Sequence, residues 1–152
     1  MIFAIDPGPT HSGWVWLSNG KVKYSGIDLN DEILVSIKDW DDPLAIETIT
    51  SYGMPVGKEV FESCVWIGRF QQAYKYPDKV KLIPRREVKT WLCGTPAAKD
   101  ANVRAALLEL FPGTGGGSTP QVGTKGKPGP LYGISGDKWS ALALAVMVEK
   151  MK

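Results

Sequence analysis

The sequence predicts an α/β domain in which a mixed β-sheet has helices packed on its faces. Short apolar runs separated by turn residues fill the N-terminal part, which favours strands that follow one another closely. Helix-like and strand-like segments then alternate, and the chain closes with an almost wholly apolar helix. At 152 residues the chain has the usual size of one domain, so we expect residues 1–152 to share a single core.

Three strands are expected first, over residues 2–6, 13–18 and 21–27. The first two are short, mainly apolar runs. Asn19-Gly20 separates the second from the third, and this dipeptide favours the tight turn of an antiparallel hairpin. The three strands are therefore expected to be antiparallel.

A helix and a fourth strand follow. Apolar residues at helical spacing predict a helix over residues 31–40, and Asp41-Asp42-Pro43 breaks that pattern. Residues 44–49 are typical of a buried strand, although one acidic residue, Glu47, interrupts it.

The longest predicted helix spans residues 57–74. Four of its residues fall near one face and are expected to point into the core: Val60, Cys64, Ile67 and Tyr74. The two cysteines, Cys64 and Cys93, lack metal-ligand spacing, so we interpret both as reduced, mostly buried thiols.

The second half continues with a strand over residues 79–84, where Val80 and Leu82 alternate with lysines. Helices are then expected over residues 85–92, 102–111 and 137–152. The last is apolar nearly throughout, so other elements must cover most of its surface.

A glycine- and proline-rich segment, residues 112–136, precedes the terminal helix. Its composition favours neither helix nor strand. A loop of this length within a compact domain is usually functional or disordered. We expect a long, mobile loop that carries Lys125 and Lys127.

Charge is distributed unevenly along the chain. Residues 1–78 contain 6 Lys and Arg against 11 Asp and Glu, whereas residues 79–152 contain 12 against 5. Binding of a polyanion requires such a basic region, but an unevenly charged solvated surface explains it equally well. No apolar stretch is long enough to span a membrane and no signal peptide is apparent, so a cytoplasmic location is expected.

Three carboxylates occupy positions where a charge is costly to bury. Asp6 ends the first strand, Glu47 interrupts an apolar strand, and Asp137 opens the apolar terminal helix. A shared divalent cation would compensate their burial, because Mg²⁺ prefers oxygen ligands. Each also has a simpler explanation: Asp6 as a turn residue, Glu47 on an exposed strand face, and Asp137 as a helix N-cap.

With these acids in this order, the sequence resembles the RuvC family of Holliday junction resolvases, within the ribonuclease H-like superfamily, and in particular its phage-type members. The resemblance covers nearly the whole chain and rests on Ala4 to Gly8 with Ser12 to Trp14, Ala45 to Glu47, Val88-Lys89 with Cys93-Gly94, Lys99 to Val103, and Gly136 to Ala145. It implies a five-stranded mixed sheet, with three antiparallel strands followed by parallel strands, flanked by helices.

The resemblance also implies a metal-dependent hydrolase. Asp6, Glu47 and Asp137 would be catalytic and would ligate Mg²⁺, or Mn²⁺ in its place, with two ions activating water and stabilising the leaving oxygen. No nucleotide cofactor is implied.

One position departs from the family. The terminal helix usually carries a second acid three residues after the first, and Ser140 occupies that position here. Three alternatives follow from this departure. Three carboxylates are sufficient to hold the metal, another acid such as Asp100 or Asp28 supplies the missing ligand, or catalysis is weakened.

Branched DNA is the implied partner. Candidate contacts to its phosphates are the basic residues Arg85, Arg86, Lys89, Lys99, Arg104, Lys125 and Lys127. Tyr52 is a candidate to stack on an unpaired base.

A homodimer is also expected, because a four-way junction has two-fold symmetry and paired nicks need two active sites. Helix 57–74 offers a face for that contact: Phe61, Val65, Gly68 and Phe70.

The expected function is therefore that of a crossover junction endodeoxyribonuclease, which nicks four-way or other branched DNA by phosphodiester hydrolysis. One alternative is another ribonuclease H-like nuclease that acts on RNA–DNA hybrids or flaps. Another is a catalytically weak junction-binding protein, because Ser140 is a poor metal ligand.

Overall fold

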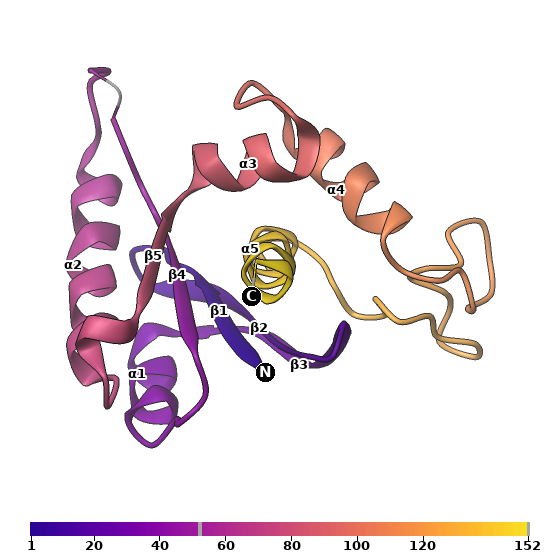
Figure 1. Cartoon of the computed structure of the whole chain (residues 1–152), viewed down its shortest axis with the longest axis horizontal. Coiled ribbons are helices and arrows are strands. Elements are labelled where there is room, and N and C mark those ends of the chain that lie inside the picture. The colour runs from indigo at the N-terminus through magenta and orange to yellow at the C-terminus, as the bar shows by residue number, and fades with distance from the viewer. Residues whose placement is uncertain (52, 152) are drawn as a thin grey trace.

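A computed structural model describes residues 1–51 and 53–151 of the chain. Its five strands form one mixed sheet in the order β3-β2-β1-β4-β5 (Figure 1). The strands are β1 (Ile2–Asp6), β2 (His11–Ser18), β3 (Lys21–Leu29), β4 (Leu44–Thr48) and β5 (Lys81–Pro84). The first three pair antiparallel, and β4 runs parallel to both β1 and β5. The predicted sheet is confirmed.

The helices also match the prediction, with ends that shift by one or two residues. They are α1 (Asn30–Lys38), α2 (Lys58–Ala73), α3 (Arg85–Cys93), α4 (Asp100–Glu109) and α5 (Lys138–Lys150), with a 3₁₀ turn at Pro77–Lys79. No helix in the described ranges is both long and apolar enough to cross a membrane.

Helices cover both faces of the sheet. α1 and α2 lie against one face and α5 against the other, with α3 and α4 outside α5 (Figure 1). Successive residues of β1 alternate between the two cores: Ile2 and Ala4 pack with α5, whereas Phe3 and Ile5 pack with α1 and α2. This two-sided burial explains why β1 is a continuous apolar run.

The core face of α2 differs from the prediction. The buried residues of this helix are Ser63, Ile67 and Phe70, followed by Tyr74 just after its end. Cys64 is exposed, so its interpretation as a buried thiol is wrong, and Phe70 lies in the core instead of on the predicted dimer face. Two neighbouring stripes on a helix have the same 3.6-residue period, and only packing selects one of them.

Residues 112–136 contain no helix or strand, as predicted, but they form a hydrogen-bonded structure. The Gly115 N–H donates to the Pro120 carbonyl at 2.8 Å, and the Gly129 N–H to the Val122 carbonyl at 2.9 Å. Gly123 has a φ of +77°, and a Cβ there would lie 2.4 Å from the Gly129 nitrogen, so the position requires glycine. Leu131 anchors the segment in the α5 core. Its mobility stays a prediction.

Candidate active site

Asp6 and Glu47 lie side by side at the carboxyl ends of two parallel strands. The register pairs Ala4 with Ala45 and Ile5 with Ile46, so the next residues on β1 and β4 are neighbours. Both alanines belong to the α5 core, and two residues further along each strand the side chain returns to the same face. Glu47 is only 5% exposed, which contradicts its alternative placement on an exposed strand face.

Asp137 lies close to Asp6 because the residue of β2 that pairs with Asp6 is a glycine, Gly13. Gly13 pairs with Asp6, and a Cβ on Gly13 would lie 2.9 Å from the Asp137 Cβ and 2.8 Å from its carbonyl carbon. The start of α5 therefore packs directly on the β2 backbone, next to Asp6. The Asp137 side chain makes no N-cap hydrogen bond, so capping does not account for it. The role of Gly13 was missed, because its partner is 124 residues away in the sequence.

The turn after Asp6 is fixed by a small polar network. The Ser12 hydroxyl donates to Asn30 Oδ1 at 2.5 Å and accepts from the Gly8 N–H at 3.1 Å. Asn30 Nδ2 donates in turn to the Gly8 carbonyl at 2.9 Å. Ser12 and Asn30 are fully buried, so each polar atom needs the partner that the other supplies. This network holds the backbone that positions Asp6, and no motif in the sequence indicated it.

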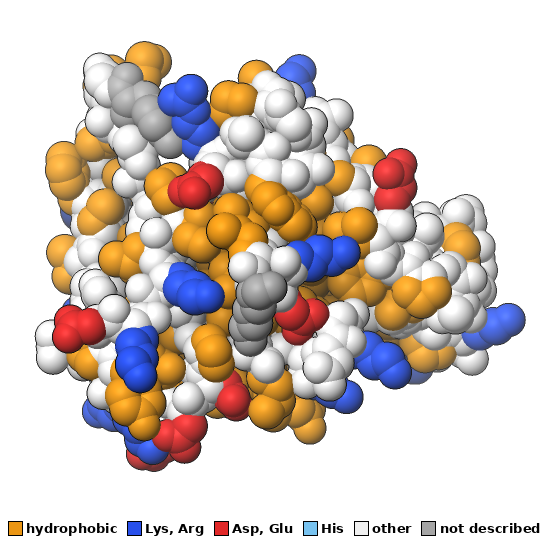
Figure 2. Space-filling model, in the orientation of Figure 1, with side chains coloured by type: hydrophobic (Ala, Val, Ile, Leu, Met, Phe, Trp, Pro, Cys, Tyr) orange, Lys and Arg blue, Asp and Glu red, His pale blue; other side chains and the backbone are white. Residues whose placement is uncertain are grey.

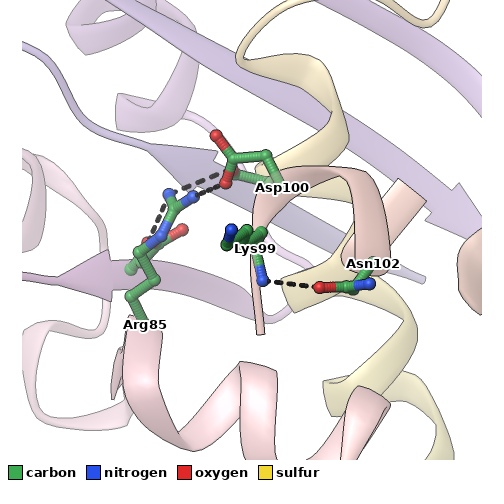
Figure 3. Close-up of polar contacts among 6 residues, drawn as sticks. Arg85, Lys99, Asp100 and Asn102 are labelled. Carbon is green, nitrogen blue, oxygen red and sulfur yellow. Dashed lines mark hydrogen bonds and ion pairs between the residues drawn. The ribbon is translucent and has the colours of Figure 1, made fainter. Parts of the chain in front are cut away.

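Arg85 lies among the acidic residues, at the start of α3 (Figure 3). Its Nη1 lies 3.4 Å from Glu47 Oε1 and donates to the Ser140 hydroxyl at 3.2 Å, and its Nη2 pairs with Asp100 Oδ1. The strand register explains this position, because Ile83 of β5 pairs with Glu47 and Arg85 follows two residues later. Arg85 was predicted to contact DNA, and its bonds to these three side chains were not anticipated.

Burial and the repulsion between neighbouring charges raise the pKa values of the carboxyl groups of Asp6 and Glu47. Burial, then the charges of Glu47 and Asp137, raise the pKa of Asp6 to about 8. Burial also raises the pKa of Glu47 to about 7, against the lowering effect of Arg85. Burial lowers the pKa of Arg85, but Glu47, Asp100 and Asp6 outweigh it and the pKa is raised, so Arg85 stays charged.

These residues fit a divalent cation by their chemistry. In residues 1–51 and 53–151, no group of three or more His, Cys, Asp or Glu side chains is close enough to hold a metal ion as they stand. Mg²⁺ needs only one or two carboxylates, since water and substrate phosphates complete its coordination. A cation beside Asp6 would relieve the repulsion that raises its pKa. The donor set therefore suits Mg²⁺ or Mn²⁺ in an open site.

Two clefts open beside these acids, on either side of Arg85. The first, of about 590 Å³, is lined by Asp6 and Glu47 together with Arg86 and Lys89. The second, of about 530 Å³, is lined by Asp137, Ser140, Asp100, Arg104 and Trp139, and the Arg104 guanidinium lies 5.2 Å from the Trp139 ring centre. Three of the predicted basic residues, Arg86, Lys89 and Arg104, thus line clefts beside the acids.

The other predicted DNA contacts are more dispersed. Lys99 is exposed at the start of α4, where its backbone N–H donates to Asn102 Oδ1 at 2.9 Å (Figure 3). Lys125 and Lys127 are exposed in segment 112–136, which forms the right-hand end of the molecule. On the face shown in Figure 2, basic side chains occupy several separate places instead of one patch. Tyr52 lies outside the described residues.

Asp28 and Asp100 are the two acids that could replace a metal ligand at position 140, and only Asp100 lies near the site. Asp28 accepts a hydrogen bond from Trp14 Nε1 at 2.6 Å and lines a small cavity with Phe3 and Ile33, on the α1 face of the sheet. Asp28 is therefore on the wrong face to replace a ligand. Asp100 is close to the site but is paired with Arg85.

No protein-family model matches the chain, and no curated protein matches it. Two solved structures of Thermus thermophilus RuvC do match it in fold. One, in complex with a Holliday junction substrate, has a TM-score of 0.63 at 18% identity, over 99% of this chain and 94% of that one. The other has a TM-score of 0.63 at 16% identity, over 99% and 95%. The chain thus has a RuvC-like ribonuclease H fold.

Proposed function

We propose that this protein is a metal-dependent endonuclease of the phage-type RuvC kind, which nicks four-way or other branched DNA junctions in the cytoplasm of a bacterium or an infected host. The observation that supports the proposal is that Asp6 and Glu47 end neighbouring strands while Asp137 packs beside Asp6, so that the charges of Glu47 and Asp137 both act on Asp6. The fold supports it, since the similar RuvC structure holds a Holliday junction substrate.

The chemistry would be phosphodiester hydrolysis. Bound Mg²⁺ would supply Lewis acidity and an activated water. Asp6, Glu47 and Asp137 would hold the metal, and Arg85 would keep the Glu47 carboxylate oriented through its Nη1 contact. Arg86 and Lys89, on the wall of the 590 Å³ cleft, would bind the phosphates that flank the scissile bond.

A substrate panel tests this proposal. Cleavage of a four-way junction, a linear duplex, a flap and an RNA–DNA hybrid is compared in Mg²⁺ and in chelator. Symmetrical nicks confined to the junction, lost in chelator and in Asp6→Asn, are expected. Asp31→Asn is the matched control, because Asp31 is exposed on α1, on the opposite face of the sheet. Preference for the hybrid would favour the other ribonuclease H-like nucleases.

Ser140 keeps one alternative open, a junction-binding protein with weak catalysis. Ser140 donates or accepts a hydrogen bond but is a poor metal ligand, and here it faces Arg85. This alternative predicts junction binding in Mg²⁺ without nicks, and equal behaviour of the parent chain and Asp6→Asn. A gel-shift assay run beside the cleavage assay separates the two functions.

We also propose that the active form is a homodimer that uses the exposed side of α2. Phe61 and Val65 are each 62% exposed there, although they are large and apolar. Sedimentation equilibrium tests this. Phe61→Asp combined with Val65→Asp is expected to give monomers, whereas Val35→Asp, at a similarly exposed valine on α1, leaves the dimer intact. A monomeric parent chain would refute the dimer.

A further inference from the structure

Arg85 makes the contacts that a metal ion would make on one side of the site. Its guanidinium faces a carboxylate oxygen of Glu47, the hydroxyl of Ser140 and a carboxylate oxygen of Asp100. All three are oxygen atoms, and they come from β4, α5 and α4. A cation that joins three oxygens from three elements is the usual arrangement of a hard metal ion.

Ser140 completes this arrangement. It lies one turn after Asp137 on α5, where its hydroxyl meets Arg85 Nη1 at 3.2 Å. A carboxylate at this position would suit a divalent cation, whereas a hydroxyl offers a neutral acceptor that matches a guanidinium N–H. Arg85 and Ser140 therefore fit each other better than either fits a metal.

The charges of the site support the same conclusion. When ionised, Asp6, Glu47, Asp100 and Asp137 carry four negative charges, and Arg85 and Lys89 act on them with two positive charges. The remaining two negative charges equal one divalent cation. A second one would add a net positive charge close to the Arg85 guanidinium, which is unfavourable at short range.

We propose that the Arg85 guanidinium takes the place of a second divalent cation, so that the site binds one metal ion per chain, beside Asp6. This inference rests on the proposed metal-dependent function of the site. Arg85 is 40% exposed at its side chain, so one edge remains open to a substrate phosphate. It supplies a permanent charge there whether or not metal is bound.

Mn²⁺ titration followed by electron paramagnetic resonance counts the bound ions directly. The whole chain is titrated alone and with a junction that carries phosphorothioate linkages, which resist cleavage. One Mn²⁺ per chain is expected in both cases, and Asp6→Asn is expected to lose it. The double variant Arg85→Ser with Ser140→Asp is expected to bind two. Arg69→Ser, at an exposed arginine of α2, is the control and keeps one.

Two results would overturn the inference: two Mn²⁺ on the parent chain, with or without DNA, or a folded double variant that still binds one. The number of Mn²⁺ ions bound to the parent chain tests the inference even if the double variant fails to fold. The outcome is separate from that of the proposed function. Junction nicking with two bound Mn²⁺ refutes only the role of Arg85, whereas one bound Mn²⁺ without cleavage of any DNA refutes only the nuclease.

Discussion

The two faces of the sheet are built from the same strands but differ in what they contain. The face under α1 and α2 is packed with large rings, such as Phe3, which stacks on Trp14 with ring centres 5.3 Å apart. The face under α5 contains aliphatic residues such as Ile2 and Leu17, but next to the carboxylates the strands carry small residues, Ala4 and Ala45. Small side chains let a helix lie close to a sheet, so the start of α5 reaches the strand ends where the acids lie. The close approach of α5 to one face therefore creates the site, whereas the rings on the other face serve packing alone.

The largest expected effect is the loss of cleavage when an acid on the α5 face is neutralised. Asp6→Asn should lower the rate of junction nicking by about 100- to 1000-fold or more. Mutation of a residue that only hydrogen-bonds to a metal ligand already lowers metal affinity or activity by about 10- to 100-fold, and loss of a ligand itself should cost more. Asp28→Asn, on the α1 face, keeps its acceptor for Trp14 and should change the rate by less than about 2-fold. Equal losses of nicking rate for the two variants in single-turnover assays would show that catalysis is not confined to the α5 face.

Stability should be shared by the two faces. Phe70→Ala on the α2 side should lower the free energy of unfolding by about 3–5 kcal/mol, and Leu144→Ala on the α5 side by about 2–5 kcal/mol, because both side chains are fully buried. Urea denaturation followed by circular dichroism measures both. A negligible change for Leu144→Ala would mean that the α5 core is not needed to hold the sheet.

Close approach of α5 should be sensitive to a single methyl group. Gly13→Ala places its Cβ 2.8 Å from the Asp137 backbone, so α5 must shift, at a cost of about 1–3 kcal/mol in the free energy of unfolding. Junction nicking should fall more than the stability loss explains, since Asp137 moves away from Asp6. Gly57→Ala is the control, because a Cβ there meets open space just before α2. Unchanged cleavage by Gly13→Ala would indicate that the position of Asp137 is not critical.

The smallest expected effect is the change in melting temperature on adding Mg²⁺, and it depends on pH. The pKa of Asp6 is raised from 3.8 to about 8 and that of Glu47 from 4.5 to about 7, so the folded chain holds protons that the unfolded chain has released. The metal-free protein should therefore lose stability as pH rises between about 4 and 8. Mg²⁺ should raise the melting temperature at pH 8 by a few degrees and have little effect at pH 5. An equal Mg²⁺ effect at both values would argue against binding at Asp6 and Glu47.

Local pattern was sufficient for most of the fold. Alternating apolar runs and the Asn19-Gly20 turn gave the antiparallel strands, because a strand and a hairpin depend on adjacent residues. The pattern was insufficient on α2, where Cys64 and Phe70 were assigned to the wrong faces. Burial on a helix depends on what packs against it, and that partner, the α1 side of the sheet, is distant in sequence.

The sequence by itself determined which residues of this protein form strands and helices, and it singled out Asp6, Glu47 and Asp137 as charges in apolar surroundings. Hydrophobic periodicity and the cost of a buried charge act locally, so both can be read from one chain. Only the tertiary structure decided that Gly13 admits Asp137 beside Asp6 and that Arg85 joins Glu47, Ser140 and Asp100. Those contacts arise from strand register and helix packing, which bring together residues that lie far apart along the chain.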